Sequence, residues 1–184
     1  MAYTLRQATR EDAPLLSELI KSSMLTYSKD SGIDPSILDS MHESVEDLII
    51  KLKTHTCLCY FDEYNMPVGT ITLKIRDDIK SFDFSDKTHE YLKDKSKILY
   101  ISRFAVLDSI RGTGLGLELL ETAFTFGNDR GADVALLHTA IHNTVRVEFY
   151  QNRGFTLIDS ESKRGYDRGL FAYDLQAVSH LNSL

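Results

Sequence analysis

The chain has 184 residues, a length that is enough to bury one substantial core. Its residues are 42% hydrophobic and 26% charged, as is ordinary for a globular protein. Its net charge of −6 argues against a general nucleic-acid binder, which needs a basic face. No segment approaches the ~20 apolar residues of a membrane span, and the first residues lack the apolar run of a signal peptide. We therefore expect a single cytoplasmic domain over residues 1–184, with no membrane or nucleic-acid partner.

The first half of the sequence predicts a strand, several helices and a hairpin. Thr9 followed by Asp12 is typical of a helix N-terminus, and apolar residues then recur at helical spacing. The expected elements are a strand at 3–8, a helix from Thr9 to about 27, short helices from Asp34 and Ser44, and strands at 56–62 and 68–76.

The second half alternates strands and helices. Residues 77–97 are polar and charged, and predict mainly a long loop of the kind that often covers a binding site. The expected elements that follow are a strand at 98–107, a helix at 115–129, a strand at 133–139, a helix at 143–152, and strands at 155–159 and 168–175. The resulting order, β-α-α-β-β-β-α-β-α-β-β, predicts a mixed α/β domain.

Cys57 and Cys59 alternate within one predicted strand, so their side chains share a face but lie too far apart for an easy disulfide. His55 shares that face, so a metal site is conceivable. Nothing elsewhere in the sequence completes a ligand set, and we expect two buried thiols and no metal.

A glycine-rich loop between the strand at 98–107 and the helix at 115–129 predicts a phosphate site. Backbone N–H groups at a helix start are unpaired and carry partial positive charge, and glycines allow close approach of a ligand. The sequence excludes two other classes of phosphate-binding loop. A Walker loop is excluded because Leu117 and Glu118 stand in place of its Lys-Ser/Thr. A dinucleotide fingerprint would need a glycine at Leu117, and it normally opens the first βαβ unit.

With these residues the chain resembles the GNAT superfamily of acyl-CoA-dependent N-acetyltransferases. The family pattern Gln/Arg-x-x-Gly-x-Gly/Ala is matched in full at 111–116. The family's Asn…Tyr-x-x-x-Gly-Phe segment is matched from Asn143 through Tyr150 to Gly154 and Phe155. The resemblance implies a largely antiparallel central sheet of about seven strands with helices on both faces.

The resemblance also implies roles for individual residues. Acetyl-CoA would be the co-substrate, and Tyr150 would be the general acid that protonates the leaving thiolate, as a phenol of pKa ~10 can do for a thiol of pKa ~8.5. The alternative for Tyr150 is a core aromatic. The implied acetyl-CoA contacts are Phe104, Ala105 and Val106 for the pantetheine arm and acetyl group, Arg111, Gly112, Thr113, Gly114, Leu115, Gly116 and Leu117 for the pyrophosphate, and Asn143 for the pantetheine region.

The sequence departs from the family at the general base. Many relatives place a glutamate on the strand before the loop, where this chain has Ser102. An amine of pKa ~10 must lose a proton before it attacks, so another group is needed. The remaining candidates, each with an ordinary structural explanation, are Glu148, His138, His142 and Asp108.

The acceptor is expected to be a primary amine of a small molecule or peptide. Residues 11–50 hold nine acidic side chains against two lysines, which slightly favours a cationic amine, although solvent-facing helix sides explain the same acids. The alternative function is a non-catalytic acyl-CoA-binding regulatory module on the same fold. Relatives are often dimers, so a homodimer is compatible with the resemblance.

Overall fold

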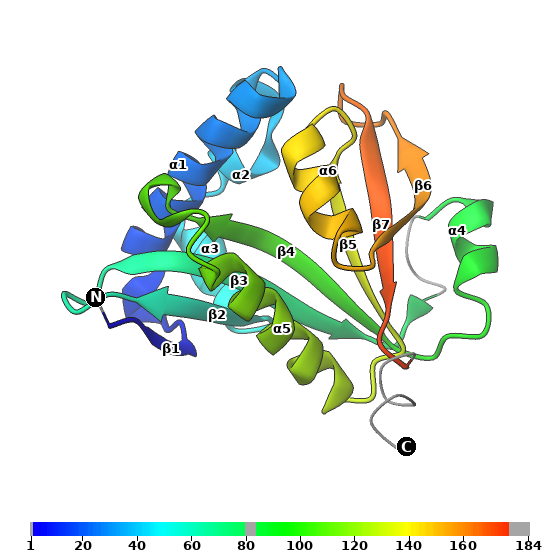
Figure 1. The fold of residues 1–184 in the computed structure, drawn as a ribbon, viewed down its shortest axis with the longest axis horizontal. Helices are drawn as coiled ribbons and strands as arrows, with labels where there is room; N and C mark the ends of the chain where they lie inside the picture. The colour runs from blue at the N-terminus through cyan, green and yellow to red at the C-terminus, as the bar shows by residue number, and fades with distance from the viewer. Residues whose placement is uncertain (1, 80–83, 177–184) are drawn as a thin grey trace. The chain divides into compact units, whose positions relative to one another are not determined.

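Seven strands are hydrogen-bonded in the order β1-β2-β3-β4-β5-β7-β6 in the computed structural model, which describes residues 2–79 and 84–176 (Figure 1). The pairs β1–β2, β2–β3, β5–β7 and β6–β7 are antiparallel. The strands are β1 (Thr4–Gln7), β2 (Thr56–Phe61), β3 (Pro67–Arg76), β4 (Ile98–Val106), β5 (Val134–Ala140), β6 (Thr156–Glu161) and β7 (Arg168–Asp174). The expected seven-stranded α/β fold is therefore confirmed.

The helices follow the expected order, with additional short turns. They are η1 (Arg10–Asp12), α1 (Ala13–Ser31), η2 (Pro35–Ile37), α2 (Asp39–His42), α3 (Val45–Leu52), α4 (Asp86–Tyr91), η4 (Asp108–Ile110), α5 (Leu115–Asn128) and α6 (Thr144–Gln151). The segment 77–97, expected to be mainly loop, contains α4; its residues 80–83 lie outside the described ones. No helix in the described part of the chain is both long and apolar enough to cross a bilayer.

The chain divides into two compact units. The first consists of Met1–Lys74 and Ile101–Ala123, and the second of Ile75–Tyr100 and Phe124–Leu184. The sequence-based expectation of one domain over residues 1–184 stays a prediction. Each unit has its own apolar cluster.

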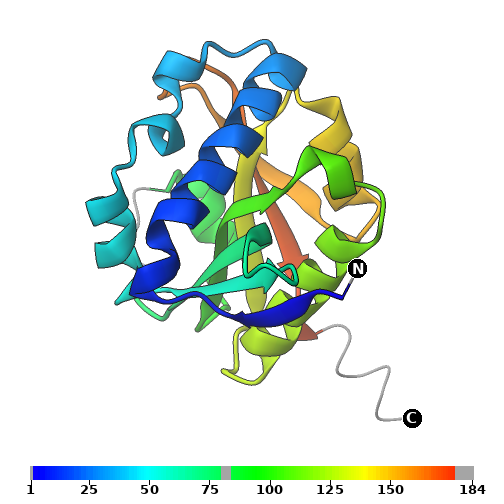
Figure 2. The same cartoon turned by 90° about the vertical axis from the view of Figure 1, so that its left-hand side faces the viewer.

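In the first unit, β2 shows why a strict alternation of residues builds a core. Cys57, Cys59 and Phe61 are buried on the face that α1 and α3 cover, while Tyr60 points to the other face and donates to Glu118 of α5 at 2.9 Å. In Figure 2, α1 is the long blue helix. Burial raises the pKa of both thiols, so they stay protonated.

The close fit of α5 to the sheet depends on Gly69 of β3. A Cβ at this position would lie 2.6 Å from a methyl carbon of Leu115 and 3.2 Å from one of Leu119. In Figure 1, α5 lies in front of β2 and β3. A glycine here therefore lets the start of α5, and the loop before it, approach β3 closely.

The start of α1 is fixed by Asp12, which is 7% exposed. Its carboxylate accepts two hydrogen bonds from Arg6 of β1, at 2.7 and 2.8 Å, and two from Thr9, at 2.7 and 3.0 Å. The Arg6 guanidinium also stacks 3.6 Å from the centroid of the Phe61 ring. The capping signal predicted at Thr9 and Asp12 is confirmed, and it joins β1, β2 and α1.

In the second unit, the two faces of β7 bury different side chains. Leu170 and Ala172 join an apolar cluster with Val134 and Leu136 of β5. The other face carries aromatic rings: Phe124 stacks on Tyr173 at a centroid distance of 4.2 Å. This second face is the one against which α6 packs, as the contact between Tyr150 and Phe171 shows.

Asp12→Asn should lower the free energy of unfolding by about 2 kcal/mol near neutral pH, because charge-assisted hydrogen bonds from Arg6 and Thr9 are weakened. Arg6 lowers the pKa of Asp12 to about 2. The stabilisation is therefore present above the unfolded pKa of ~3.9 and is lost as the pH falls toward the folded value.

Urea unfolding of both proteins across this pH range measures the difference, with Glu18→Gln on the exposed side of α1 as the control. Equal stability of Asp12→Asn and the control near neutral pH would contradict this account.

Candidate active site

The glycine-rich loop lies in the first unit, between η4 and α5 (Figure 1). Gly112 and Gly114 have φ values of +81° and +94°, a left-handed region that residues with a Cβ rarely occupy. No heavy atom lies within 4 Å of a Cβ built on either glycine. Backbone conformation, rather than space, is therefore the reason for glycine at both positions.

The loop leaves backbone amides open at the start of α5. The N–H of Leu117 donates to the carbonyl of Gly114 at 2.9 Å, and that of Thr113 donates more weakly to Ile110 at 3.4 Å. Within the described residues, the amides of Gly112, Gly114, Leu115 and Gly116 make no hydrogen bond. Open amides at a helix N-terminus fit the pyrophosphate of acetyl-CoA.

Arg111 is held beside this loop by an ion pair. Its Nη2 lies 2.7 Å from Oδ1 of Asp108, whose other oxygen accepts a hydrogen bond from Thr26 of α1 at 2.7 Å. The Arg111 charge is thus partly neutralised by Asp108, and both side chains are exposed. Backbone amides, more than this guanidinium, make up the anion-binding potential of the loop.

The segment Phe104 to Val106 places alternate side chains on opposite faces at the end of β4. Phe104 and Val106 both reach the start of α5, where a Cβ on Gly116 would lie 3.7 and 3.6 Å from them. Ala105 is buried, 2% exposed. The residues expected to hold the pantetheine arm and the residues of the glycine-rich loop are therefore neighbours in the first unit.

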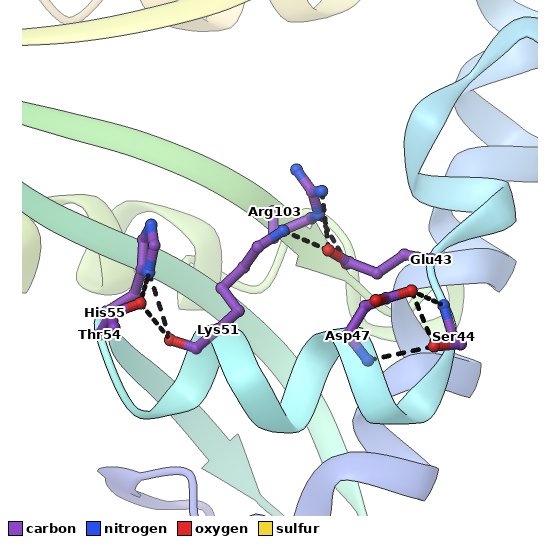
Figure 3. Close-up of polar contacts among 7 residues, drawn as sticks. All are labelled: Glu43, Ser44, Asp47, Lys51, Thr54, His55 and Arg103. Atoms are coloured by element: carbon purple, nitrogen blue, oxygen red, sulfur yellow. Dashed lines mark hydrogen bonds and ion pairs between the residues drawn. The ribbon is translucent and has the colours of Figure 1, made fainter.

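Arg103, one residue before this segment, lies within β4 but has a left-handed backbone at φ +49°. This conformation costs a residue with a Cβ roughly 1–2 kcal/mol. Its guanidinium makes a two-pronged contact with Glu43, with Nε–Oε2 and Nη2–Oε1 distances of 3.0 Å each (Figure 3). The ion pair offsets the strain and ties β4 to the corner between α2 and α3.

Glu43 is fixed by its position as well as by its partners. Ser44 follows it as the N-cap of α3, in a reciprocal capping pair with Asp47 that Figure 3 also shows. Lys51 of α3 donates to the same Glu43 carboxylate. Burial alone would raise the pKa of Glu43, but the hydrogen bonds from Arg103 and Lys51 outweigh it and hold that pKa below its usual value. Glu43 is therefore ionised and engaged.

Asn143 and Tyr150 lie in the second unit, at the two ends of α6. Asn143 is the N-cap: its Oδ1 accepts from the N–H of Arg146 at 3.1 Å. Its side chain is fully buried, and its Nδ2 has no hydrogen-bond partner among residues 2–79 and 84–176. The structure shows a capping role for Asn143, and the contact with pantetheine stays a prediction.

Tyr150 is 5% exposed and packs among aromatic rings. The centroid of its ring lies 5.4 Å from that of Phe149 and 5.6 Å from that of Phe155, both at steep angles. These contacts fix the direction of the phenol. They are also what the alternative of a core aromatic predicts, so the acid role of Tyr150 stays a prediction.

The four candidate bases are not equivalent in the structure. Glu148 is exposed on α6, and Asp108 is paired with Arg111. His142 is exposed and lies 3.5 Å from Asp167. Burial and the nearby Arg168 lower the pKa of His138 to about 3, which makes it a weak base. The contacts of these four residues single out none of them as the general base.

Neither the Glu43–Arg103 pair nor the hydrogen bond between Tyr100 and His138, at 2.8 Å, is predictable from a local sequence pattern. The first pair joins residues 60 positions apart. For the hydrogen bond between Tyr100 and His138, the only sequence signal is a single histidine within the apolar strand 134–140. Within the described ranges, no three His, Cys, Asp or Glu side chains form a metal-ligand group.

Gly114→Ala should lower the free energy of unfolding by about 1 kcal/mol, because alanine at a positive φ is strained. Gly116→Ala is the matched control, because its φ is not positive and its added Cβ would meet Val106 at 3.6 Å, an ordinary contact. Denaturant unfolding should rank Gly116→Ala at or above the parent protein. Equal losses in both variants would show that conformation is not what requires glycine at 114.

Glu43→Gln should destabilise the protein by about 2 kcal/mol, because it leaves Arg103 and Lys51 without a charged acceptor. Arg103→Gly adopts a positive φ without help, so in that background the same Glu43 change should cost clearly less. A double-mutant cycle of unfolding free energies measures this coupling. Glu46→Gln, on the exposed side of α3, is the control. If the changes in unfolding free energy at 43 and 103 simply add, the ion pair does not stabilise the backbone of Arg103.

The chain matches known proteins in both sequence and fold. The sequence model of the acetyltransferase (GNAT) family matches residues 19–155, while the comparison with curated proteins found no match. A PaiA N-acetyltransferase from Thermoplasma acidophilum, in complex with coenzyme A, is similar with a TM-score of 0.71 and 19% identity, over 95% of this chain and 99% of that one.

Two further structures agree. A GNAT acetyltransferase from Staphylococcus aureus Mu50 has a TM-score of 0.66 at 20% identity, over 95% of this chain and 99% of its own. A chimera of the Vibrio cholerae spermidine N-acetyltransferase SpeG with hSSAT has a TM-score of 0.66 at 16% identity, over 96% and 98%. At these identities the structures establish the fold, and the sequence match to residues 19–155 establishes the family: the chain belongs to the GNAT acetyltransferases.

Proposed function

We propose that the chain transfers an acetyl group from acetyl-CoA to a primary amine of a small molecule or peptide. The observation that supports this most directly is the loop before α5, whose left-handed glycines leave the amides of Gly112, Gly114, Leu115 and Gly116 open. A member of this family that keeps the phosphate-binding geometry has the means to hold the donor. The coenzyme A in the PaiA neighbour is compatible with the same donor.

In the proposed reaction, the neutral amine attacks the thioester carbonyl, the carbon–nitrogen bond forms, and the carbon–sulfur bond breaks to release the thiolate. The proton lost by the nitrogen passes to solvent. Backbone N–H groups near Val106 would stabilise the oxyanion, since this segment follows the left-handed backbone of Arg103 in β4. The Tyr150 phenol would donate a proton to the leaving sulfur. Its aromatic neighbours restrict the ring, which favours a fixed donor over a mobile one.

The proposed amine acceptor is less constrained than the donor. The acids of residues 11–50 slightly favoured a cationic acceptor, but several of them serve the fold of the first unit. Asp12 binds Arg6, Glu43 binds Arg103 and Lys51, and Asp47 caps α3. Only acids outside such pairs, such as the exposed Glu18 and Glu46, remain to attract a cationic acceptor.

One observation favours the regulatory alternative. Ser102 stands where many relatives carry a catalytic glutamate, and the carboxylate that does reach β4, Glu43, is neutralised by two cations. A module that binds acetyl-CoA without transferring the acetyl group would need no base. The two functions differ in turnover and agree in donor binding.

Release of free coenzyme A thiol, measured over a panel of primary amines, tests the proposal. We expect acetyl-CoA binding by calorimetry together with amine-dependent thiol release. Binding without turnover on any amine would favour the regulatory module, and no binding of acetyl-CoA would exclude both.

Tyr150→Phe should lower kcat by about tenfold or more, because the leaving thiolate loses its proton donor. The dissociation constant of acetyl-CoA should hardly change, because the aromatic ring and its packing remain. Tyr64→Phe, at a side chain 78% exposed in the β2–β3 turn, is the control. An unchanged kcat in Tyr150→Phe would remove this residue from the mechanism.

A further inference from the structure

The second unit contains a cavity of about 670 Å³ on the face of β5 and β7 opposite to Tyr150. Leu170 lines it from β7, His138 from β5 and Tyr100 from β4. Such a volume suits a small molecule. None of the residues expected to bind acetyl-CoA lines this cavity.

Arg168 is the most informative residue of the cavity wall. It lies at the start of β7, opposite Ala140, and therefore on the same face as His138 and Leu170. Its side chain is only 12% exposed, yet among the residues described its only polar partner is Glu161, at a long Nε–Oε1 distance of 3.5 Å. A guanidinium has five N–H donors in a planar fork, so most of the Arg168 donors lack an acceptor within the described part of the chain.

His138 provides a second polar group on the same wall. Its Nδ1 lies 2.8 Å from the hydroxyl of Tyr100. Burial, followed by the charge of Arg168, keeps the imidazole neutral by lowering its pKa. When the Tyr100 hydroxyl donates to Nδ1, the neutral ring carries its proton on Nε2, which is then a hydrogen-bond donor.

The charges of the cavity lining favour an anion. Among the described residues, four cationic side chains and two carboxylates line it. The cations are Arg76, Lys163, Arg164 and Arg168. Arg76 is paired with Asp78 at 3.3 Å and Arg168 with Glu161 at 3.5 Å, while Asp159 accepts from Ser85 and from Thr88 at 2.7 Å. Positive charges still outnumber negative ones on this wall, which favours an anionic ligand.

We propose that this cavity binds the carboxylate or phosphate group of a small molecule, with the Arg168 guanidinium as its main contact and His138 as a second hydrogen-bond donor. A planar guanidinium pairs with either oxyanion through two parallel hydrogen bonds. The aliphatic and aromatic side chains of Leu170 and Phe84 would contact the apolar part of the same ligand. The proposal concerns binding alone and does not depend on acetyl transfer.

Calorimetric titration with glutarate at low salt tests the site, with the uncharged glutaramide as the matched probe. We expect glutarate to bind and glutaramide not to. Arg168→Gln should weaken glutarate binding by about tenfold or more, and Arg168→Lys, which keeps the charge without the fork, by less. Arg130→Gln removes a cation elsewhere in the second unit, where it stacks on Phe126, and should leave binding unchanged.

A measurement on the unaltered protein tests the site even if the variants do not fold. The ¹⁵N resonance of His138 Nε2 should shift on addition of glutarate and not on addition of glutaramide. Equal binding of both probes, or glutarate binding that neither shifts this resonance nor responds to Arg168→Gln in a folded variant, would overturn the proposal.

The same probe identifies the source of the anion once an amine substrate is known. Competition between glutarate and the amine would assign the oxyanion to the acceptor itself. A change in kcat without competition would assign it to a separate ligand. Acetyl-CoA binding, measured independently, shows whether the proposed function stands when the anion site fails.

Discussion

The proposed binding of acetyl-CoA depends on backbone amides that the fold leaves open at the start of α5. Gly112 and Gly114 turn the chain through left-handed conformations, and Gly69 of β3 lets the helix start approach the sheet. Four amides of the loop consequently have no acceptor in the described chain. A diphosphate satisfies such groups without any particular side chain, so the donor can be inferred more firmly than the acceptor.

The segment next to this loop depends on an ion pair that comes from the helices. Arg103 takes a strained backbone conformation in β4, and Glu43 holds its guanidinium from the corner between α2 and α3. The acidic residues of the early helices therefore stabilise the fold. Asp12 accepts hydrogen bonds at the start of α1, Asp47 forms a capping pair with Ser44 at the start of α3, and Glu43 holds Arg103 of β4. A count of charges along the sequence therefore overestimates the number of acidic side chains available to attract a cationic acceptor.

Local signals made most of the fold predictable. The capping pairs at Thr9 and Ser44, the alternation along β2 and the glycines at 112–116 each act over a few residues, so the sequence shows them directly. The Glu43–Arg103 pair and the wall formed by His138 and Arg168 join residues distant in sequence, and only the folded chain brings them together. Tyr150 is intermediate: its motif predicts a role, while its packing fits that role and a purely structural one.

Amide NMR during a titration with acetyl-CoA measures whether the open amides bind the donor. We predict that the backbone N–H signals of Gly112, Gly114, Leu115 and Gly116 shift strongly as the complex forms. The N–H of Leu117, already bonded to Gly114 at 2.9 Å, should shift less. A complex that forms while the four open amides keep their free positions would contradict the account.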